Sequence, residues 1–146
     1  MADITPAAVL HFGLCTTDLE HSKRFYTEAL GFSVKTYVEE LGAPFDTLME
    51  LPGAKLHGYQ ITSGPVTIEL MSFTNLDPTG SNERRPMNQL GLTHVTLLVD
   101  DPEAAKARVE QYGGKVIKES AIDTPYGPIV FCTDPDGVRL ELMKPF

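Results

Sequence analysis

The sequence predicts an α+β protein built from two tandem βαβββ modules with curled mixed sheets. Two observations carry this prediction. The first is an imperfect internal repeat with an offset of 83 residues, whose anchors are His11/His94, Asp18/Asp101, Glu20/Glu103 and Gly31/Gly114. The second is a phrase that closes each half, IELM at 68–71 and LELM at 140–143. We therefore treat residues 1–146 as a single domain of two modules.

Module one spans residues 8–73. Residues 8–16 are rich in β-formers, and the capping-box pattern at 17–20 opens a helix that ends at the C-capping Gly31. The buried stripe of that helix comprises Leu19, Ser22, Tyr26, Ala29 and Leu30. Residues 32–40, 54–62 and 65–73 predict three further strands, with a hairpin turn at 63–65 and a short helical turn at 45–51.

Module two spans residues 91–143 and follows a linker at 74–90, for which we expect a lid or an interface arm. A strand containing residues 94–99 precedes a helix, which Asp101 caps and Pro102 opens at its first position. The stripe of this helix comprises Ala105, Val109 and Tyr112, and glycines end it at 113–114. Residues 115–119, 127–133 and 137–143 predict the remaining strands, with a turn at 134–137.

The composition excludes several classes of function. The chain carries 12 Lys+Arg against 20 Asp+Glu, a net charge of −8, so it gains no counterion-release affinity for nucleic acid. No stretch approaches the roughly 20 apolar residues of a membrane-spanning helix, and residues 1–6 lack the pattern of a secretory signal. We expect a cytoplasmic protein without nucleic-acid or membrane partners, in which Cys15 and Cys132 are reduced, buried thiols.

Strand alternation places four potential metal ligands on one side of the sheets. His11 and Glu69 of module one, and His94 and Glu141 of module two, alternate with apolar neighbours. Because the apolar faces take the helices, these side chains share the helix-free face, where curling of the sheets brings them around one cavity. Two imidazoles and two carboxylates suit Zn, Ni, Co, Mn or Fe(II). A salt-bridged structural role for each glutamate is the alternative.

Three phrases extend this pattern: residues 18–32 (DLEHSKRFYTEALGF), 91–95 (GLTHV) and 134–142 (DPDGVRLEL). With the paired modules they resemble the vicinal oxygen chelate superfamily, which includes glyoxalase I, methylmalonyl-CoA epimerase, extradiol dioxygenases and the fosfomycin and bleomycin resistance proteins. The resemblance covers essentially the whole chain and is closest to the glyoxalase I or methylmalonyl-CoA epimerase type. It implies the glyoxalase fold, with His11, Glu69, His94 and Glu141 as metal ligands.

The resemblance also implies a chemistry. A divalent metal in this ligand set stabilises an enolate as a Lewis acid, so that a carboxylate base can move a proton α to a carbonyl or thioester. Glu69 and Glu141 are the expected catalytic residues, each in a mixed role of ligand and base. The expected activity is that of a metal-dependent lyase, isomerase or epimerase. An Fe(II) extradiol ring-cleavage dioxygenase and a non-catalytic binding protein for a drug or metabolite are the alternatives.

Four further residues are candidates for contact with a small-molecule substrate: Arg139, Met71, Phe73 and His57. Arg139 shares the predicted cavity face with Glu141, where it clamps a substrate carboxylate or pairs with a neighbouring acid. His57 lines the cavity or lies at the surface or in the core. Many relatives in the superfamily build each site from two chains, so we expect a homodimer, with a site inside one chain as the alternative.

Overall fold

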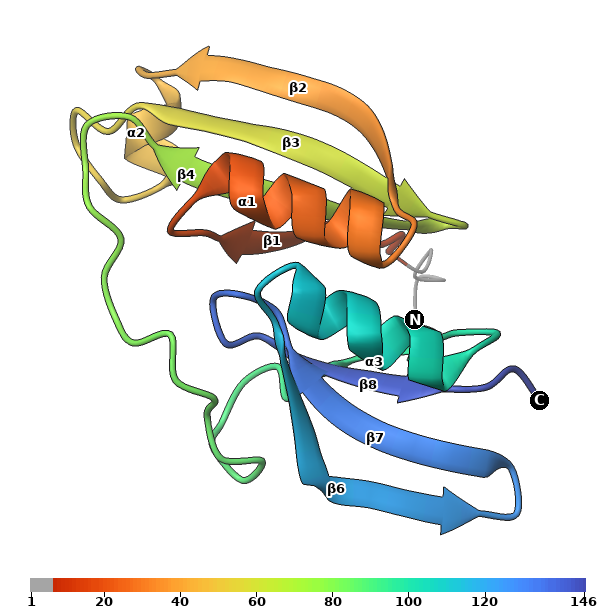
Figure 1. Ribbon diagram of the computed structural model, residues 1–146. Helices are drawn as coiled ribbons and strands as arrows, with labels where there is room; N and C mark the ends of the chain where they lie inside the picture. Colours follow the sequence, from red (N-terminus) through yellow and green to blue (C-terminus); the bar gives the residue numbers. More distant parts are fainter. Residues whose placement is uncertain (1–6) are drawn as a thin grey trace, which may run out of the picture.

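The computed structural model describes residues 7–146, and its backbone repeats one unit twice (Figure 1). The first unit contains β1 (Phe12–Cys15), α1 (Leu19–Arg24), the π-helical η1 (Phe25–Ala29), β2 (Ser33–Leu41), α2 (Phe45–Leu48), β3 (Leu56–Ser63) and β4 (Val66–Phe73). The second contains β5 (Val95–Leu98), α3 (Pro102–Gln111), β6 (Lys115–Thr124), β7 (Gly127–Thr133) and β8 (Arg139–Met143). The predicted α+β fold of two βαβββ modules is confirmed.

Each module forms one four-stranded mixed sheet with the same strand order. The orders are β1-β4-β3-β2 and β5-β8-β7-β6. In both sheets the first strand pairs in parallel with the last, and the other pairings are antiparallel. As a consequence, β1 and β5 are edge strands, and each lies beside the strand that carries the glutamate of the closing phrase.

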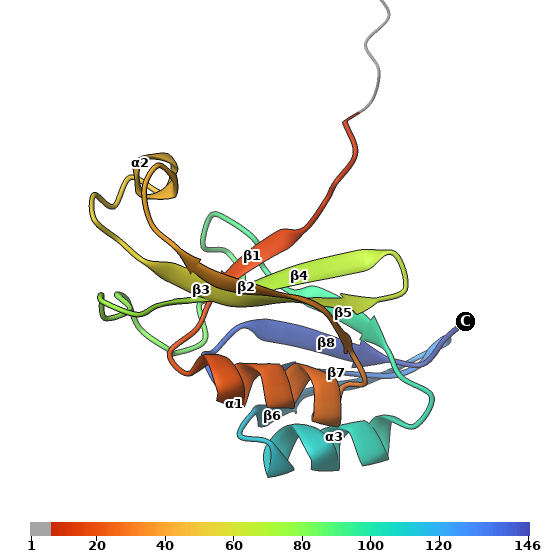
Figure 2. The same ribbon diagram turned by 90° about the horizontal axis from the view of Figure 1, so that it is seen from above.

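The two modules share one hydrophobic core on the helix-bearing side of the sheets. Figure 2 shows α1 and α3 lying side by side below the strands, and α3 contacts η1. Phe25 and Tyr26 of η1 are fully buried, and ring centroids 5.2 Å apart place them edge to face. The same cluster holds Leu70 of module one and Leu142 of module two, both fully buried. The helices therefore join the modules through apolar packing, and the opposite faces of the sheets stay uncovered.

The helix starts agree with the sequence in module two and differ in detail in module one. Asp101 caps α3 by accepting hydrogen bonds from the N–H groups of residues 103 and 104, as predicted. In module one, Asp18 rather than Thr17 is the cap and accepts from the N–H of His21. The expected capping box is wrong because Thr17 donates instead to Asp136 of the other module.

Two strands differ in length from their predicted ranges. β1 begins only at Phe12, and residues 7–10 are exposed outside the sheet. β6 continues to Thr124, five residues beyond its predicted end, after an irregularity between Ile117 and Ile122. The Ser120 hydroxyl bridges this irregularity: it donates to the carbonyl of Ile117 and accepts the N–H of Phe131. A side chain thus replaces ladder hydrogen bonds that strand patterning alone cannot foresee.

The turn at 134–137, between β7 and β8, fastens module two to module one. Its Asp134 is 2% exposed and accepts the Tyr26 hydroxyl at 2.8 Å through Oδ2. Oδ1 of Asp134 accepts the N–H groups of Asp136 and Val138. Asp136 in turn accepts hydrogen bonds from Thr17 at the start of α1. We call this set of contacts the turn latch.

The turn latch predicts a specific pH dependence of stability. Burial raises the pKa of the Asp134 carboxyl from 3.8 to about 6, so the folded state binds this proton more tightly than the unfolded state does. Its stabilising contribution is complete below the unfolded pKa and is lost as pH rises through the folded pKa. Asp134→Asn removes this titration. We expect the unfolding free energy of Asp134→Asn minus that of the parent to increase by about 2 kcal/mol between pH 4 and pH 7.

Urea unfolding of the parent and of Asp134→Asn from pH 4 to pH 7 measures the difference between their unfolding free energies. Tyr26→Phe is the matched variant, because it removes the hydroxyl partner and leaves the titrating carboxyl in place. The hydrogen bond from Tyr26 lowers the pKa of Asp134, so Tyr26→Phe should lose stability with rising pH at least as steeply as the parent does, whereas Asp134→Asn loses this dependence. A parent-to-Asn difference that is constant with pH would contradict this account of Asp134.

No helix among residues 7–146 is long and apolar enough to cross a bilayer. Residues 1–6, on which the expected lack of a secretory signal rests, lie outside the described part of the chain. Cys15 and Cys132 are both unpaired, as predicted, but only Cys132 is buried: the expected burial of Cys15 is wrong, because it lies exposed at the end of an edge strand. Burial raises the pKa of the Cys132 thiol to about 12 and also raises that of Cys15, so neither is a ready thiolate at neutral pH.

Candidate functional site

The strand faces follow the predicted alternation. Ile68 and Leu70 of β4 are 2% and 0% exposed on the helix side, and Glu69 between them points to the uncovered face. Leu140 and Leu142 of β8 flank Glu141 in the same way. In both modules the glutamate stands in mid-strand, opposite the core.

In module one a histidine and a glutamate form a close pair. His11 directly precedes β1, and the parallel pairing of β1 with β4 brings Gly13 opposite Glu69. His11 Nε2 lies 3.4 Å from Glu69 Oε2, and the two side chains are 31% and 19% exposed. His11 Nδ1 is buried without a hydrogen-bond partner within the described residues. The pair therefore presents one nitrogen and one carboxylate at the edge of the sheet.

Module two repeats the pair with additional support. His94 directly precedes β5, and its Nε2 lies 4.0 Å from Glu141 Oε2. Thr96, the repeat counterpart of Gly13, donates a 3.1 Å hydrogen bond to Glu141 Oε1. The Thr93 hydroxyl lies 2.9 Å from His94 Nδ1. These contacts orient both donors of the pair, whereas module one holds a glycine where Thr96 stands.

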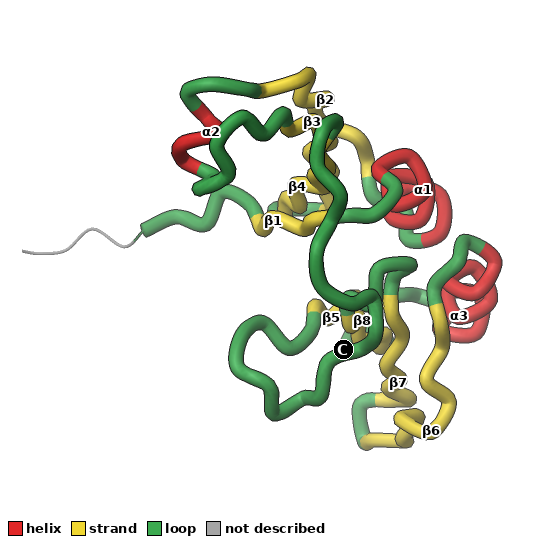
Figure 3. Tube along the Cα trace, turned by 90° about the vertical axis from the view of Figure 1, so that its left-hand side faces the viewer, coloured by secondary structure: helices red, strands yellow, loops and turns green. Residues whose placement is uncertain are grey.

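The two pairs do not meet within one chain. Among residues 7–146, no group of three or more His, Cys, Asp or Glu side chains is close enough to hold a metal ion. Residues 7–146 of one chain therefore do not form a four-ligand site by themselves, and a site shared between the two chains of a homodimer stays a prediction. The modules pack through their helices, which lie together on one side of the strands (Figure 3). The two glutamates alternate with core residues and therefore lie on the other face of their own sheets.

The other predicted contact residues divide between the two sides of the sheets. Met71 and Phe73 follow Glu69 at alternate positions of β4, and both are half-buried on its face. Arg139 shares the face of Glu141 and is only 7% exposed, with its guanidinium carbon 5.2 Å from the centroid of the Phe131 ring. His57 pairs with Ser72, so it lies on the opposite, helix-bearing face from Glu69.

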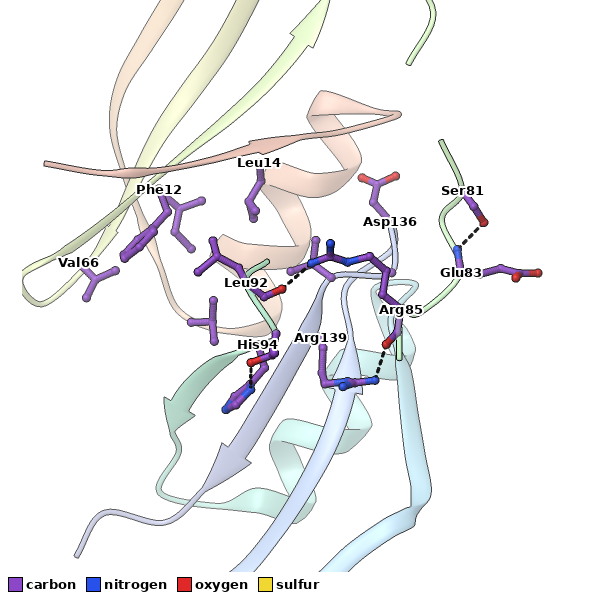
Figure 4. Close-up of a pocket in the computed structure, with 15 residues that line it drawn as sticks. Phe12, Leu14, Val66, Ser81, Glu83, Arg85, Leu92, His94, Asp136 and Arg139 are labelled. Carbon is purple, nitrogen blue, oxygen red and sulfur yellow. Dashed lines mark hydrogen bonds between the residues drawn. The ribbon is translucent and has the colours of Figure 1, made fainter. Parts of the chain in front are cut away.

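A cavity of about 440 Å³ lies between the modules, and neither Glu69 nor Glu141 borders it. Module one supplies Phe12, Leu14 and Val66 to its wall, and module two supplies Leu92. Figure 4 shows the imidazole of His94, which also borders the cavity, pointing away from these apolar side chains. Sequence reasoning missed this cavity, because strand alternation shows which side chains share a face but not how two modules pack.

Part of the linker closes this intermodule cavity. We call residues 81–85 the strap; Ser81, Glu83 and Arg85 border the cavity (Figure 4). Gly137 lies directly under the strap, at a φ of +86°, and a Cβ atom there would come within 2.2 Å of the Asn82 carbonyl oxygen. Arg139 Nη2 donates a 2.7 Å hydrogen bond to the Arg85 carbonyl. The linker thus lies fixed against module two.

Comparison with known proteins agrees with this architecture. The family model described as the Glyoxalase/Bleomycin resistance protein/Dioxygenase superfamily matches residues 8–142. The uncharacterised protein YaeR of Escherichia coli is 31% identical over 138 residues, which cover 93% of this chain and 95% of YaeR. A lactoylglutathione lyase of Salmonella typhimurium is 30% identical over 138 residues, which cover 93% of this chain and 91% of the lyase.

A crystal structure of a glyoxalase family protein from Bacillus cereus shares the fold. It superposes with a TM-score of 0.85 at 16% identity and covers 99% of this chain and 97% of its own. The repeated βαβββ units, the full-length family match and these relatives lead to one conclusion. The chain belongs to the glyoxalase/bleomycin resistance protein/dioxygenase superfamily.

Proposed function

We propose that the protein is a divalent-metal-dependent lyase, isomerase or epimerase that moves a proton α to a carbonyl or thioester. The observation that carries this proposal is the matched pair of His–Glu contacts, His11 with Glu69 and His94 with Glu141, on the uncovered faces of the two modules. Two imidazole nitrogens and two carboxylates are a donor set that first-row divalent metals accept.

The separations within the pairs fit a shared ion. Two atoms that each lie about 2.1 Å from one ion are at most about 4.2 Å apart. The 3.4 Å and 4.0 Å separations of the pairs satisfy this limit. Each histidine turns Nε2 toward its glutamate, and the Thr93 hydroxyl is placed to fix the tautomer of His94 through Nδ1. The residues present therefore suit Zn, Ni, Co, Mn or Fe(II).

A homodimer completes the site in this proposal. Each chain carries one pair per module, so module one of one subunit and module two of the other would together supply two histidines and two glutamates. The edge strands favour such an association: β1 and β5 each lack a neighbour on one side, and they carry exposed apolar side chains such as Phe12 (41%) and Leu98 (57%). A two-fold dimer would hold two equivalent sites.

The chain's own residues divide the chemistry among them. A bound divalent ion would supply Lewis-acid stabilisation of negative charge on a substrate oxygen. Glu69 and Glu141 hold the ion, and one of them accepts the proton from the carbon α to the carbonyl. Thr96 holds one oxygen of Glu141 in place. Met71 and Phe73 extend the same face as an apolar wall beside Glu69.

The comparison with the lactoylglutathione lyase supports a lyase of the same class. That relative is 30% identical and aligns over nearly its whole length. The four-donor set also distinguishes the site from the two-histidine, one-carboxylate triad of non-haem Fe(II) oxygenases, which keeps positions open for dioxygen. Proton transfer is therefore favoured over ring cleavage.

Metal analysis followed by an exchange assay tests the proposal. The protein, purified without added metal and then loaded separately with each candidate ion, should bind about one ion per chain. It should then exchange the α-proton of a suitable substrate in D2O, with methylglyoxal–glutathione adduct and an acyl-CoA thioester as the first two. Stoichiometric metal with cleavage of a catechol under Fe(II), or a ligand-binding protein free of metal, would overturn it in favour of the dioxygenase or the binding protein.

A further inference from the structure

We infer that the intermodule cavity is a second binding site, which takes a small organic anion with an apolar body. The anionic end would bind at the strap, on the guanidinium of Arg85. The apolar body would lie against the side chains contributed by module one. Neither glutamate of the two His–Glu pairs borders the cavity, and the imidazole of His94, which does border it, points away from the apolar wall (Figure 4).

The wall and size of the cavity suit an apolar body. Phe12, Leu14 and Val66 point from β1 and β4 toward module two, and Leu92 faces them from below (Figure 4). Phe12 and Leu92 are 41% and 67% exposed, so a ligand would remove apolar surface from water. A volume of about 440 Å³ lies within the range of sites for small molecules.

The guanidinium groups of Arg85 and Arg139 border the strap end of the cavity, together with the carboxylates of Glu83 and Asp136. Neither of these arginines forms an ion pair with a carboxylate of residues 7–146. Arg139 is 7% exposed, and its Nε and Nη1 atoms are buried without a hydrogen-bond partner in the described chain. A buried guanidinium without a counter-charge is costly. An anion at this end of the cavity would offset that cost by electrostatic attraction to the guanidinium of Arg139.

Arg85 is the group placed to contact that anion directly. Its guanidinium lies at the centre of the view in Figure 4, between Leu92 and Asp136, and its only hydrogen bond within residues 7–146 goes to the carbonyl oxygen of Leu92. Guanidinium groups bind carboxylates through paired donors. The remaining N–H donors of Arg85 therefore make the direct contact with the anion. Arg139 attracts the anion electrostatically without touching it.

The two acidic residues that border the cavity do not oppose this binding directly. Asp136 is already engaged by hydrogen bonds from Thr17 and Ser22. Figure 4 shows the Glu83 carboxylate turned away from the cavity. Both carboxylates keep their negative charge, so the preference for an anion depends on its direct contact with the guanidinium of Arg85 and not on the net charge of the lining.

Octanoate is a direct probe, with uncharged 1-octanol as its matched control. Titration of the full-length protein, followed by calorimetry and by amide shifts in 1H–15N spectra, should show saturable binding of octanoate with shifts at Ser81 and Gly91. Octanol should bind at least about tenfold more weakly, because it lacks the charge-assisted hydrogen bonds. Equal binding of the two probes, or no binding of octanoate at millimolar concentration, would overturn the inference.

Three variants separate the site from general electrostatics. Arg85→Gln should weaken octanoate binding at least about tenfold. Val66→Asp, at a position that is 39% exposed, should do the same by placing a negative charge in the wall. Arg84→Gln removes the same charge from a residue that does not border the cavity, and its affinity should stay within about twofold of the parent.

Two results would refute the site. Equal losses of octanoate affinity in Arg84→Gln and Arg85→Gln would show that octanoate responds only to the overall charge of the protein. Variants at 66 and 85 that change the dimerisation constant in sedimentation, while octanoate has no effect, would show that a second copy of the chain fills the cavity. Neither result depends on metal binding, so failure here leaves the proposed activity untouched.

Discussion

Replacing either His11 or His94 with alanine will abolish retention of a divalent metal and leave the fold intact. Each imidazole supplies one of the four donors of the shared site, and the three donors that remain hold a first-row divalent ion less tightly. The side chains are 31% and 27% exposed and lie outside the hydrophobic core, so their loss costs little packing. We expect metal affinity to fall at least about a hundredfold, with unchanged circular dichroism and melting temperature of the metal-free protein.

His57→Ala is the matched control for these two variants. Its imidazole is half-buried and lies on the helix-bearing side of the first sheet, opposite Glu69. Metal content measured by plasma spectrometry should therefore equal that of the parent. If His11→Ala or His94→Ala bound metal as tightly as the parent, the assignment of the ligands would be wrong.

Replacing Gly114 with alanine will destabilise the whole molecule, because this glycine lies where the two modules meet. A Cβ atom there would come within 2.4 Å of the carbonyl oxygen of Thr133 and 2.8 Å of both Phe25 and Val109. Phe25 belongs to module one and Val109 to module two, so the clash would separate the shared core. We expect a loss of about 3 kcal/mol in the free energy of unfolding.

Gly42→Ala is the control for this substitution, since nothing lies within 4 Å of a Cβ atom at that position. Its unfolding free energy should stay within about 0.5 kcal/mol of the parent. Urea unfolding of each variant should also remain one cooperative transition, because the core is common to both modules. Two separated transitions in Gly114→Ala would show that the modules fold independently and that the shared core contributes little.

The fold within each module could be predicted from local pattern. Alternating apolar positions around Glu69 and Glu141 identify which face each glutamate takes, and the structure agrees on both. Asp101 followed by Pro102 identifies the start of α3, because capping depends only on neighbours in the chain. These features need no knowledge of the other module.

The features that were missed all depend on contacts between distant segments. Thr17 could not be excluded as a cap without knowing that Asp136 lies beside it. The π-helical turn at Phe25 places a second large ring in the core, which a stripe of ordinary helical spacing omits. The separation of the two His–Glu pairs follows from helix-to-helix packing of the modules, and strand alternation carries no information on that packing.

Mixed dimers test the shared metal site most directly. One parent carries His11→Ala with Glu69→Gln, the other carries His94→Ala with Glu141→Gln, and each alone should bind no metal. After unfolding together and refolding, half of the dimers are mixed, and each mixed dimer holds one intact site built from the unaltered modules. The account predicts recovery of about one quarter of the parental metal per chain. If the mixture bound no metal although mixed dimers had formed, the site would not be shared between two chains, and the central claim would be wrong.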